Sequence, residues 1–174
     1  NKYAVSAGGG TVNVNNGEQA KDIQIDGNIG LLKSDLGASI ININMNTADS
    51  YLNGVIYDEA TNEKSELNFT LQNGAVWTNK LYNTNSNFAG STVRKIVGGS
   101  SATSAGNIFQ NDTNKINITN YSGNTNIFYA HENKGTSADD YIAGDTIIGN
   151  AAVGSNVSLI TDNAKINTVR LNEV

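Results

Sequence analysis

The sequence contains neither cysteine nor proline among its 174 residues. Without cysteine, the chain has no disulfide framework, no thiolate nucleophile and no cysteine-ligated metal site. Proline cannot donate a hydrogen bond to a β ladder, so its absence suits a chain whose strands pair on both edges. The two absences exclude a disulfide-stapled domain and favour a fully paired β structure.

Charged side chains are also scarce, at 16% of the chain, and acidic residues outnumber basic ones by 16 to 11, which gives a net charge of −5. This balance repels polyphosphates and anionic membranes, so we expect no nucleic-acid partner. No segment approaches the ~18 apolar residues of a membrane-spanning helix, and there is no basic-then-apolar signal peptide. Because the sequence opens NKYAVSAGGG without a methionine, we expect a fragment of a longer protein.

Asparagine is abundant, at roughly one residue in six. It accompanies short runs in which apolar and polar residues alternate: Ile41, Ile43 and Met45, for example, are separated by asparagines. Each run is bounded by Gly, Asn, Asp or Ser, and turns recur about every 8–12 residues, which is typical of an all-β chain. Only GLLKSDLG, residues 30–37, predicts a helical turn or two, stopped by Gly37.

Two architectures fit this pattern: an antiparallel sandwich or barrel, and a parallel β-solenoid. Short one-sided strands suit the rungs of a solenoid, stacked asparagines can hydrogen-bond along a ladder, and asparagine tolerates the left-handed backbone of a corner. The Asn-Gly pairs keep no fixed register; they are Asn16-Gly17, Asn53-Gly54 and Asn73-Gly74. No repeat of constant length is visible. We therefore predict an all-β, right-handed parallel β-helix with almost no helix. Its irregular coils of about 20–25 residues would form a rod about 35–40 Å long.

Residues 66–79, ELNFTLQNGAVWTN, distinguish the two architectures. In a hairpin, Trp77 would lie across an antiparallel ladder from Leu67 or Phe69. In a solenoid corner, these three side chains and Leu71 would all point into one core. We predict the corner, with Trp77 buried and used for packing.

The same stretch carries a family resemblance. LNFTLQNGAVWTN, residues 67–79, resembles the recurring Leu-x-Leu-x-Asn-Gly-Ala/Ser-x-Trp rung of autotransporter passenger domains, the secreted β-helices of Gram-negative bacteria. Residues 45–58 resemble the rung that commonly precedes it, and residues 116–163 resemble the C-terminal stabilising, or autochaperone, segment. The resemblance implies that residues 1–115 are rungs of a passenger fragment and that residues 116–174 are autochaperone-like rungs of the same solenoid.

The autochaperone resemblance also places strands in the C-terminal part. They would cover residues 116–120, 127–129, 140–142 and 157–159, with a Ser-Gly turn after the first. Passengers of this family cross the outer membrane as extended chains, for which cysteine is unfavourable, and their functions range from adhesion and self-association to proteolysis and toxicity. The resemblance implies a secreted or cell-surface location. It implies contact with the outer membrane only through a translocator outside these residues.

Few side chains suggest chemistry. His131 is the only histidine and is predicted to lie at a strand end near a turn, without a functional role. Asp139, Asp140 and Asp145 form the densest acidic cluster, which we expect to cap turns and not to bind calcium. The serine-rich residues 98–106 contain no Gly-x-Ser-x-Gly nucleophile elbow and are expected to form a flexible loop.

A glycosidase would need two acids facing one cleft, about 5–10 Å apart. Asp22 with Asp26 and Asp58 with Glu59 are candidate pairs, but no cluster of exposed Trp or Tyr is evident to stack sugar rings. We expect no catalytic residue, no metal site and no cofactor. The predicted function is that of a stalk or adhesin that is not an enzyme and whose partner is a host-cell receptor, a glycan or another copy of itself. The alternatives are a carbohydrate-active β-helix, either a polysaccharide lyase or a glycosidase, and a trimeric phage or surface fibre subunit.

Overall fold

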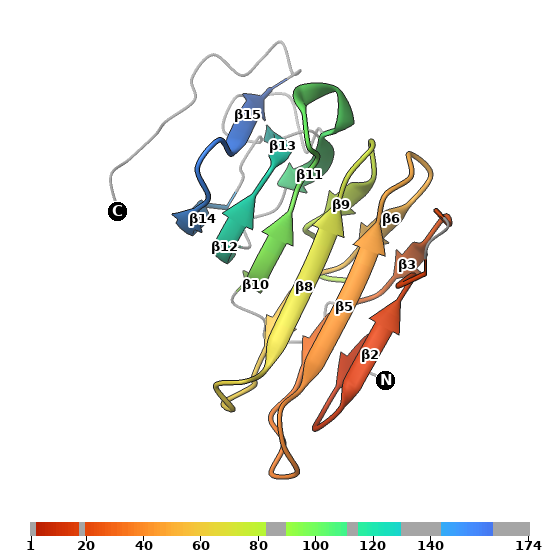
Figure 1. Ribbon diagram of the computed structural model, residues 1–174, viewed down its shortest axis with the longest axis vertical. Helices are drawn as coiled ribbons and strands as arrows, with labels where there is room; N and C mark the ends of the chain where they lie inside the picture. The colour runs from red at the N-terminus through yellow and green to blue at the C-terminus, as the bar shows by residue number, and fades with distance from the viewer. Residues whose placement is uncertain (1–2, 18–19, 83–89, 111–114, 130–143, 162–174) are drawn as a thin grey trace.

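The computed structural model describes residues 3–17, 20–82, 90–110, 115–129 and 144–161 (Figure 1). Sheet A contains β1 (Val5–Ala7), β4 (Ile29–Leu31) and β7 (Ile56–Asp58). Sheet B contains β2 (Thr11–Val14), β5 (Ile40–Met45), β8 (Glu66–Leu71), β10 (Gly90–Val97), β12 (Lys115–Ser122) and β14 (Thr146–Ala151). Sheet C contains β3 (Gln24–Asp26), β6 (Tyr51–Asn53), β9 (Val76–Thr78), β11 (Gly106–Gln110), β13 (Asn124–Tyr129) and β15 (Asn156–Ile160).

Every ladder between these strands is parallel, and each strand pairs with the equivalent strand of the next coil. Sheet B shows this order plainly, since its strands lie side by side from β2 to β14 (Figure 1). The chain therefore winds as a β-solenoid of stacked parallel sheets, as predicted, and it is all-β.

The coils are irregular, as predicted, but longer than predicted. Asn13 and Asn42, which are paired in β2 and β5, are 29 residues apart, and Asn42 and Asn68 are 26 apart. Over the described residues, the six strands of sheet B at a spacing of ~4.8 Å span about 24 Å from first to last, which is shorter than the 35–40 Å predicted for the whole chain. Corner loops between the sheets account for the additional residues in each coil.

The predicted helical turns at residues 30–37 are wrong. Leu31 belongs to strand β4 and is fully buried, and residues 32–39 form a corner loop that leads to β5. A helix here would break the parallel pairing of β4 with β1 and β7. The described residues contain one helical segment, the 3-10 turn η1 (Ala102–Ser104), and no helix long and apolar enough to cross a membrane.

The η1 turn lies within residues 98–106, which were predicted to be a flexible loop. The segment is instead held by hydrogen bonds: the Ser104 hydroxyl accepts from the Ser101 backbone at 3.0 Å, and Gly99 exchanges backbone bonds with Asn124 at 2.9 and 2.8 Å. Glycine and serine composition alone could not reveal the Asn124 partner, because it comes from the next coil.

The corner predicted at Asn73-Gly74 is confirmed. Asn73 has φ 55° and Gly74 has φ 84°, both in the left-handed region, and the chain passes from β8 in sheet B to β9 in sheet C. Their backbone N–H groups donate to Ser104 O at 2.8 Å and Ala105 O at 3.0 Å, and Asn73 Nδ2 donates to Asn46 O at 2.9 Å. The turn is therefore bonded to its neighbours on both sides and does not close a hairpin.

Replacing Asn73 with alanine should cost about 2 kcal/mol, because alanine meets the left-handed penalty and loses the bond to Asn46. Asn73→Gly should cost only about 1 kcal/mol, because glycine adopts the left-handed conformation freely and loses the side-chain bond alone. Urea unfolding followed by circular dichroism measures both losses. Equal costs for the two variants would mean that the backbone conformation of this corner carries no strain.

The core is a set of side-chain stacks that run along the solenoid. The two longest stacks come from sheets B and C, and their fully or nearly fully buried members are Ile43, Phe69, Ile96 and Tyr121 in one and Leu52, Trp77, Ile108 and Ile127 in the other. Leu67 and Leu71 are fully buried as well. The prediction that Trp77 shares one core with the apolar residues of β8 is therefore confirmed.

Strand β10 changes the cross-section of the solenoid. In the first three coils a loop separates sheet A from sheet B, at residues 8–10, 32–39 and 59–65. In the next coil β10 has no such loop: its first residues lie against β7 and its last three pair with β8. Arg94 and Lys95 both lie outward at this point, which we call the β10 bend.

The C-terminal strand predictions are confirmed where they are described. Residues 116–120, 127–129 and 157–159 lie in β12, β13 and β15, and Gly123 turns the chain at φ 85°. Residues 140–142 lie outside the described residues. The division of the solenoid between residues 115 and 116 stays a prediction.

Candidate functional site

A shallow groove of about 660 Å³ lies on the outside of sheet B, at the β10 bend. Its polar lining comes from β7, β8, β10 and β12 and includes Asp58, Glu66, Asn68, Arg94, Lys95 and Asn120. We call it the outer groove. Four of the residues that line it are charged: Asp58, Glu66, Arg94 and Lys95. Some of these side chains make contacts within the protein, and others are open to a ligand.

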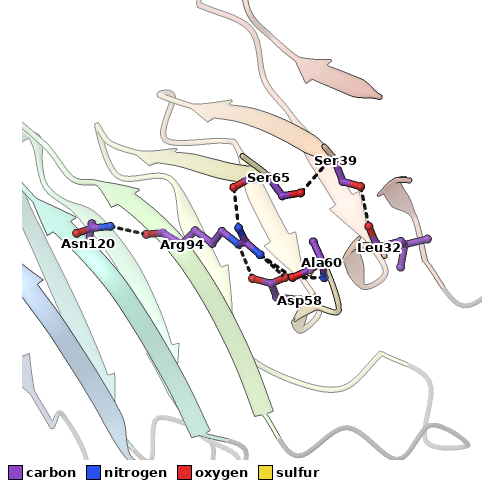
Figure 2. Close-up of polar contacts among 7 residues, drawn as sticks. All are labelled: Leu32, Ser39, Asp58, Ala60, Ser65, Arg94 and Asn120. Carbon is purple, nitrogen blue, oxygen red and sulfur yellow. Dashed lines mark hydrogen bonds and ion pairs between the residues drawn. The ribbon is translucent and has the colours of Figure 1, made fainter. Parts of the chain in front are cut away.

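The Arg94 side chain makes its contacts within the protein (Figure 2). Its Nε and Nη2 donate to the two carboxylate oxygens of Asp58 at 2.7 and 3.2 Å. Its Nη1 and Nη2 also donate to the backbone oxygens of Ser65 at 2.7 Å and Ala60 at 2.9 Å. One guanidinium therefore closes the loop of residues 59–65 against β10, and few of its donors remain for a ligand.

Asp58 occupies a position that is apolar in the preceding coils. In the ladder of sheet A it follows Ala7 and Leu31, which are 4% and 0% exposed. The Asp58 side chain is only 10% exposed, and Ala60 N donates a third hydrogen bond to it at 3.0 Å. A carboxylate at such a position needs a charged partner, because burial removes its hydration. Arg94 supplies that partner.

Two serines, Ser39 and Ser65, connect successive coils at the corner beside Arg94 (Figure 2). Gly9 N donates to Ser39 Oγ at 3.0 Å, and Ser39 N donates to Ser65 Oγ at 3.0 Å. The Ser39 hydroxyl in turn donates to Leu32 O at 2.6 Å. A serine hydroxyl thus connects the first coil to the second and the second to the third. Between the third and fourth coils, the Arg94 guanidinium makes the connection through Ser65 O.

The outer face of sheet B carries an asparagine row that enters the groove. Asn42 Nδ2 donates to Asn13 Oδ1 at 2.9 Å, and Asn68 Nδ2 donates to Asn42 Oδ1 at 2.8 Å and to Glu66 Oε2 at 3.1 Å. The expectation that stacked asparagines bond along a ladder is confirmed. The outward amides therefore repeat once per coil, about 4.8 Å apart.

Lys95 interrupts this row. It pairs with Asn68 on one side and Asn120 on the other, and Asn150 follows Asn120. The Lys95 side chain is exposed, and its ammonium group makes no hydrogen bond or ion pair within the part of the chain that the structure describes. Beyond it, Asn120 Nδ2 donates to Arg94 O at 3.4 Å, so the amides no longer bond to one another. An unshared ammonium group between two amides is the main feature that the groove offers a ligand.

Sequence alternation alone did not locate the β10 bend. Buried positions change spacing there: Val93 is followed by Ile96, and in the next strand Ile118 is followed by Tyr121. This shift from a spacing of two to a spacing of three, repeated in paired strands, is the pattern that could have revealed the bend and its outward Arg94.

The acidic and histidine candidates do not form a described site. His131, Asp139 and Asp140 lie outside the described residues. Asp145 is exposed, and its backbone oxygen accepts from Ile116 N at 2.8 Å. Among the described residues no group of three or more His, Cys, Asp or Glu side chains is placed to hold a metal ion.

Carboxylates of both candidate pairs also accept hydrogen bonds from other side chains of the protein. Asp22 accepts from Thr47 Oγ1 at 2.7 Å, and Asp26 accepts from Asn53 Nδ2 at 2.8 Å and from the Tyr51 hydroxyl at 3.2 Å. These donors all belong to the following coil, so both acids join coils together. In the other pair, Asp58 is bound to Arg94 as described.

Tyrosines meet in a way that the sequence did not suggest. Tyr3 and Tyr57 stack with ring centroids 6.4 Å apart and planes at 17°. Gly30, which pairs with Tyr57 in sheet A, makes this possible, because a Cβ there would lie 2.7 Å from the Tyr3 ring. The hydrogen bond to Glu59, burial and the charge of Glu59 raise the pKa of the Tyr57 phenol. Both tyrosines are half-buried, so the pair is not an exposed aromatic surface for sugar rings.

No family model, curated protein or solved structure matches this chain. The chemistry of the outer faces and the resemblance of the rung sequences are therefore the features that bear on function.

Proposed function

We propose that this chain is part of a secreted or surface-displayed bacterial passenger and acts as a stalk or adhesive surface. The observation that supports this function best is the asparagine row on sheet B, where equivalent outward amides recur on successive coils. A repeated polar strip suits binding by many weak contacts, whose combined strength comes from avidity.

The chemistry of the strip favours a neutral polar ligand. An amide offers two donors and one acceptor without net charge, which suits the hydroxyl groups of a glycan or the polar strip of another copy. A single such contact contributes about 1 kcal/mol, too little for stable attachment by one site. Many copies along a rod or on a cell surface overcome this weakness. A host-cell receptor with an extended polar surface is the third partner consistent with it.

A carbohydrate-active β-helix remains the second candidate because of the outer groove. Glu66 and Lys95 are both exposed there and lie in adjacent strands of the same face. A carboxylate and an ammonium group in one groove can in principle transfer protons to a bound saccharide. The trimeric fibre alternative has no specific observation in its favour among the described residues.

One experiment separates the two candidates. The protein is incubated with a panel of polysaccharides, and the products and the retention of the protein on the same glycans are both measured. Retention is measured for the monomer and for beads that carry many copies. We expect retention of the beads, little retention of the monomer and no product. The double variant Asn42→Ala, Asn68→Ala should reduce bead retention several-fold.

The matched control is Asn126→Ala. Asn126 Nδ2 donates to Asn107 Oδ1 at 3.1 Å, the equivalent amide bond on sheet C, so this variant loses a similar contact on another face. It should retain the binding of the parent protein. Product formation that disappears in Glu66→Gln would contradict the adhesive function and support the carbohydrate-active one.

A further inference from the structure

We propose that Asn16 is a modification site, at which the side-chain amide converts spontaneously to a carboxylate in the folded protein. The other two Asn-Gly pairs, Asn53-Gly54 and Asn73-Gly74, have the same local sequence but are protected by the solenoid. The inference depends on the hydrogen bonds of the three pairs and is independent of the proposed function.

The reaction needs a free backbone nitrogen and a mobile side chain. The Gly17 amide nitrogen loses its proton and attacks Cγ of Asn16, so a C–N bond forms and a cyclic succinimide closes. The bond from Cγ to Nδ2 breaks, and the side-chain nitrogen leaves with the proton as ammonia. Water then opens the ring at one of its two carbonyls and leaves either an aspartate or an isoaspartate. Glycine favours this attack because no Cβ hinders its nitrogen and its backbone rotates freely.

At Asn73-Gly74 both reacting groups are held. Gly74 N donates to Ala105 O at 3.0 Å, and Asn73 Nδ2 donates to Asn46 O at 2.9 Å. The attack would first require both bonds to break. The corner would also have to leave its left-handed conformation, although hydrogen bonds hold it to the coils on both sides.

Asn53-Gly54 is held in a similar way. Gly54 N donates to Thr78 O at 3.2 Å, and Asn53 Nδ2 donates to Asp26 Oδ1 at 2.8 Å. The Asn53 carbonyl also accepts from Gly27 N at 3.0 Å. The nitrogen, the leaving amide and the linking peptide are thus all fixed by neighbouring coils.

Asn16-Gly17 has none of these restraints. Both residues are exposed, and within the described residues neither the Asn16 side chain nor Gly17 N makes a hydrogen bond. A Cβ built on Gly17 meets no atom within 4 Å, so the surroundings leave room for the ring to close. The structure holds only the preceding residue, Asn15, whose Nδ2 donates to Asn44 O at 3.0 Å.

The modification would change the first coil in two ways. A carboxylate replaces a neutral amide just after β2 and makes the net charge of −5 one unit more negative. In the isoaspartate product the backbone also gains one carbon between residues 16 and 17. Both changes lie at an exposed turn, so we expect the fold to survive them.

Peptide mapping by mass spectrometry tests the proposal on the whole chain, incubated in mildly alkaline buffer. In the native protein Asn16 should convert at least about tenfold faster than Asn53 or Asn73, the factor expected when two hydrogen bonds must first break. In denaturant the three sites should convert at similar rates. Native conversion of Asn53 or Asn73 as fast as that of Asn16 would overturn the proposal, as would an Asn16 that converts only in denaturant.

Gly17→Ala provides the matched variant. The open space at Gly17 and its φ outside the left-handed region mean that alanine should leave the fold unchanged, which circular dichroism verifies. The added methyl group should slow conversion of Asn16 several-fold, because it hinders the attacking nitrogen. An unchanged rate would show that Gly17 N is not the nucleophile and would also overturn the proposal.

Discussion

Replacing Trp77 with alanine should lower the free energy of unfolding by about 3–5 kcal/mol, a large share of the stability of a single domain. The indole is fully buried, and Phe69 packs against it edge to face, with centroids 5.8 Å apart and planes at 88°. Its Nε1 donates to Gly54 O at 2.9 Å, so the variant leaves a cavity and also an unpaired buried carbonyl. Urea unfolding followed by circular dichroism measures the loss.

Trp77→Phe separates the two causes. Phenylalanine fills most of the cavity but cannot donate to Gly54 O, so it should cost only about 1–2 kcal/mol. Tryptophan emission of the parent protein should be blue-shifted and should move to the red on unfolding. A loss below about 1.5 kcal/mol for Trp77→Ala, or red-shifted native emission, would contradict the packing role.

Replacing Arg94 with methionine should destabilise the protein by about 2–4 kcal/mol, somewhat below the range for a fully buried pair because the Arg94 side chain is 25% exposed. The variant leaves the Asp58 carboxylate, which is 10% exposed, without its charged partner. It also removes the donors that hold Ser65 O and Ala60 O. Urea unfolding at neutral pH measures this effect.

The control is the double variant Asp58→Leu, Arg94→Met. Leucine is the residue that the ladder of sheet A carries at this position one coil earlier, at Leu31, so the substitution suits its surroundings. Replacing a buried ion pair with apolar side chains of similar size is often nearly neutral. We expect the double variant to recover to within about 1 kcal/mol of the parent protein. A double variant as unstable as Arg94→Met would place the loss in the loop contacts of Arg94 and not in the ion pair.

Local patterns were sufficient to predict the architecture. Alternation in Ile41, Ile43 and Met45 placed these side chains on one buried face, and the chemistry of Asn73-Gly74 fixed a left-handed corner. These features depend on residues close together in sequence. The predicted turn at 30–37 failed for the opposite reason: Leu31 is held in a strand by partners in β1 and β7, which local propensity does not represent.

The outer groove could be predicted only in part. The abundance of asparagine and the geometry of a parallel ladder predicted the stacked asparagines. Neither predicted that Asp58 is the partner of Arg94. Asp58 lies 36 residues before Arg94, in a different sheet, and the two meet because β10 omits the loop of the earlier coils. The sequence also did not predict the pair of Tyr3 and Tyr57. Their contact depends on the lengths of the coils, which decide which distant residues become neighbours.

The varying loops between sheets A and B show where this architecture accepts change. Three residues connect the sheets in the first coil at positions 8–10, and longer segments do so at 32–39 and 59–65, yet in all three coils the ladders of sheets A and B keep their pairing. Length at this corner is therefore decoupled from the register of the rungs. A foreign peptide inserted beside Leu36, which is 91% exposed, would project from the side of the rod while the ladders stay paired. The solenoid can therefore serve as a display scaffold in which peptides are inserted or replaced at each corner loop separately.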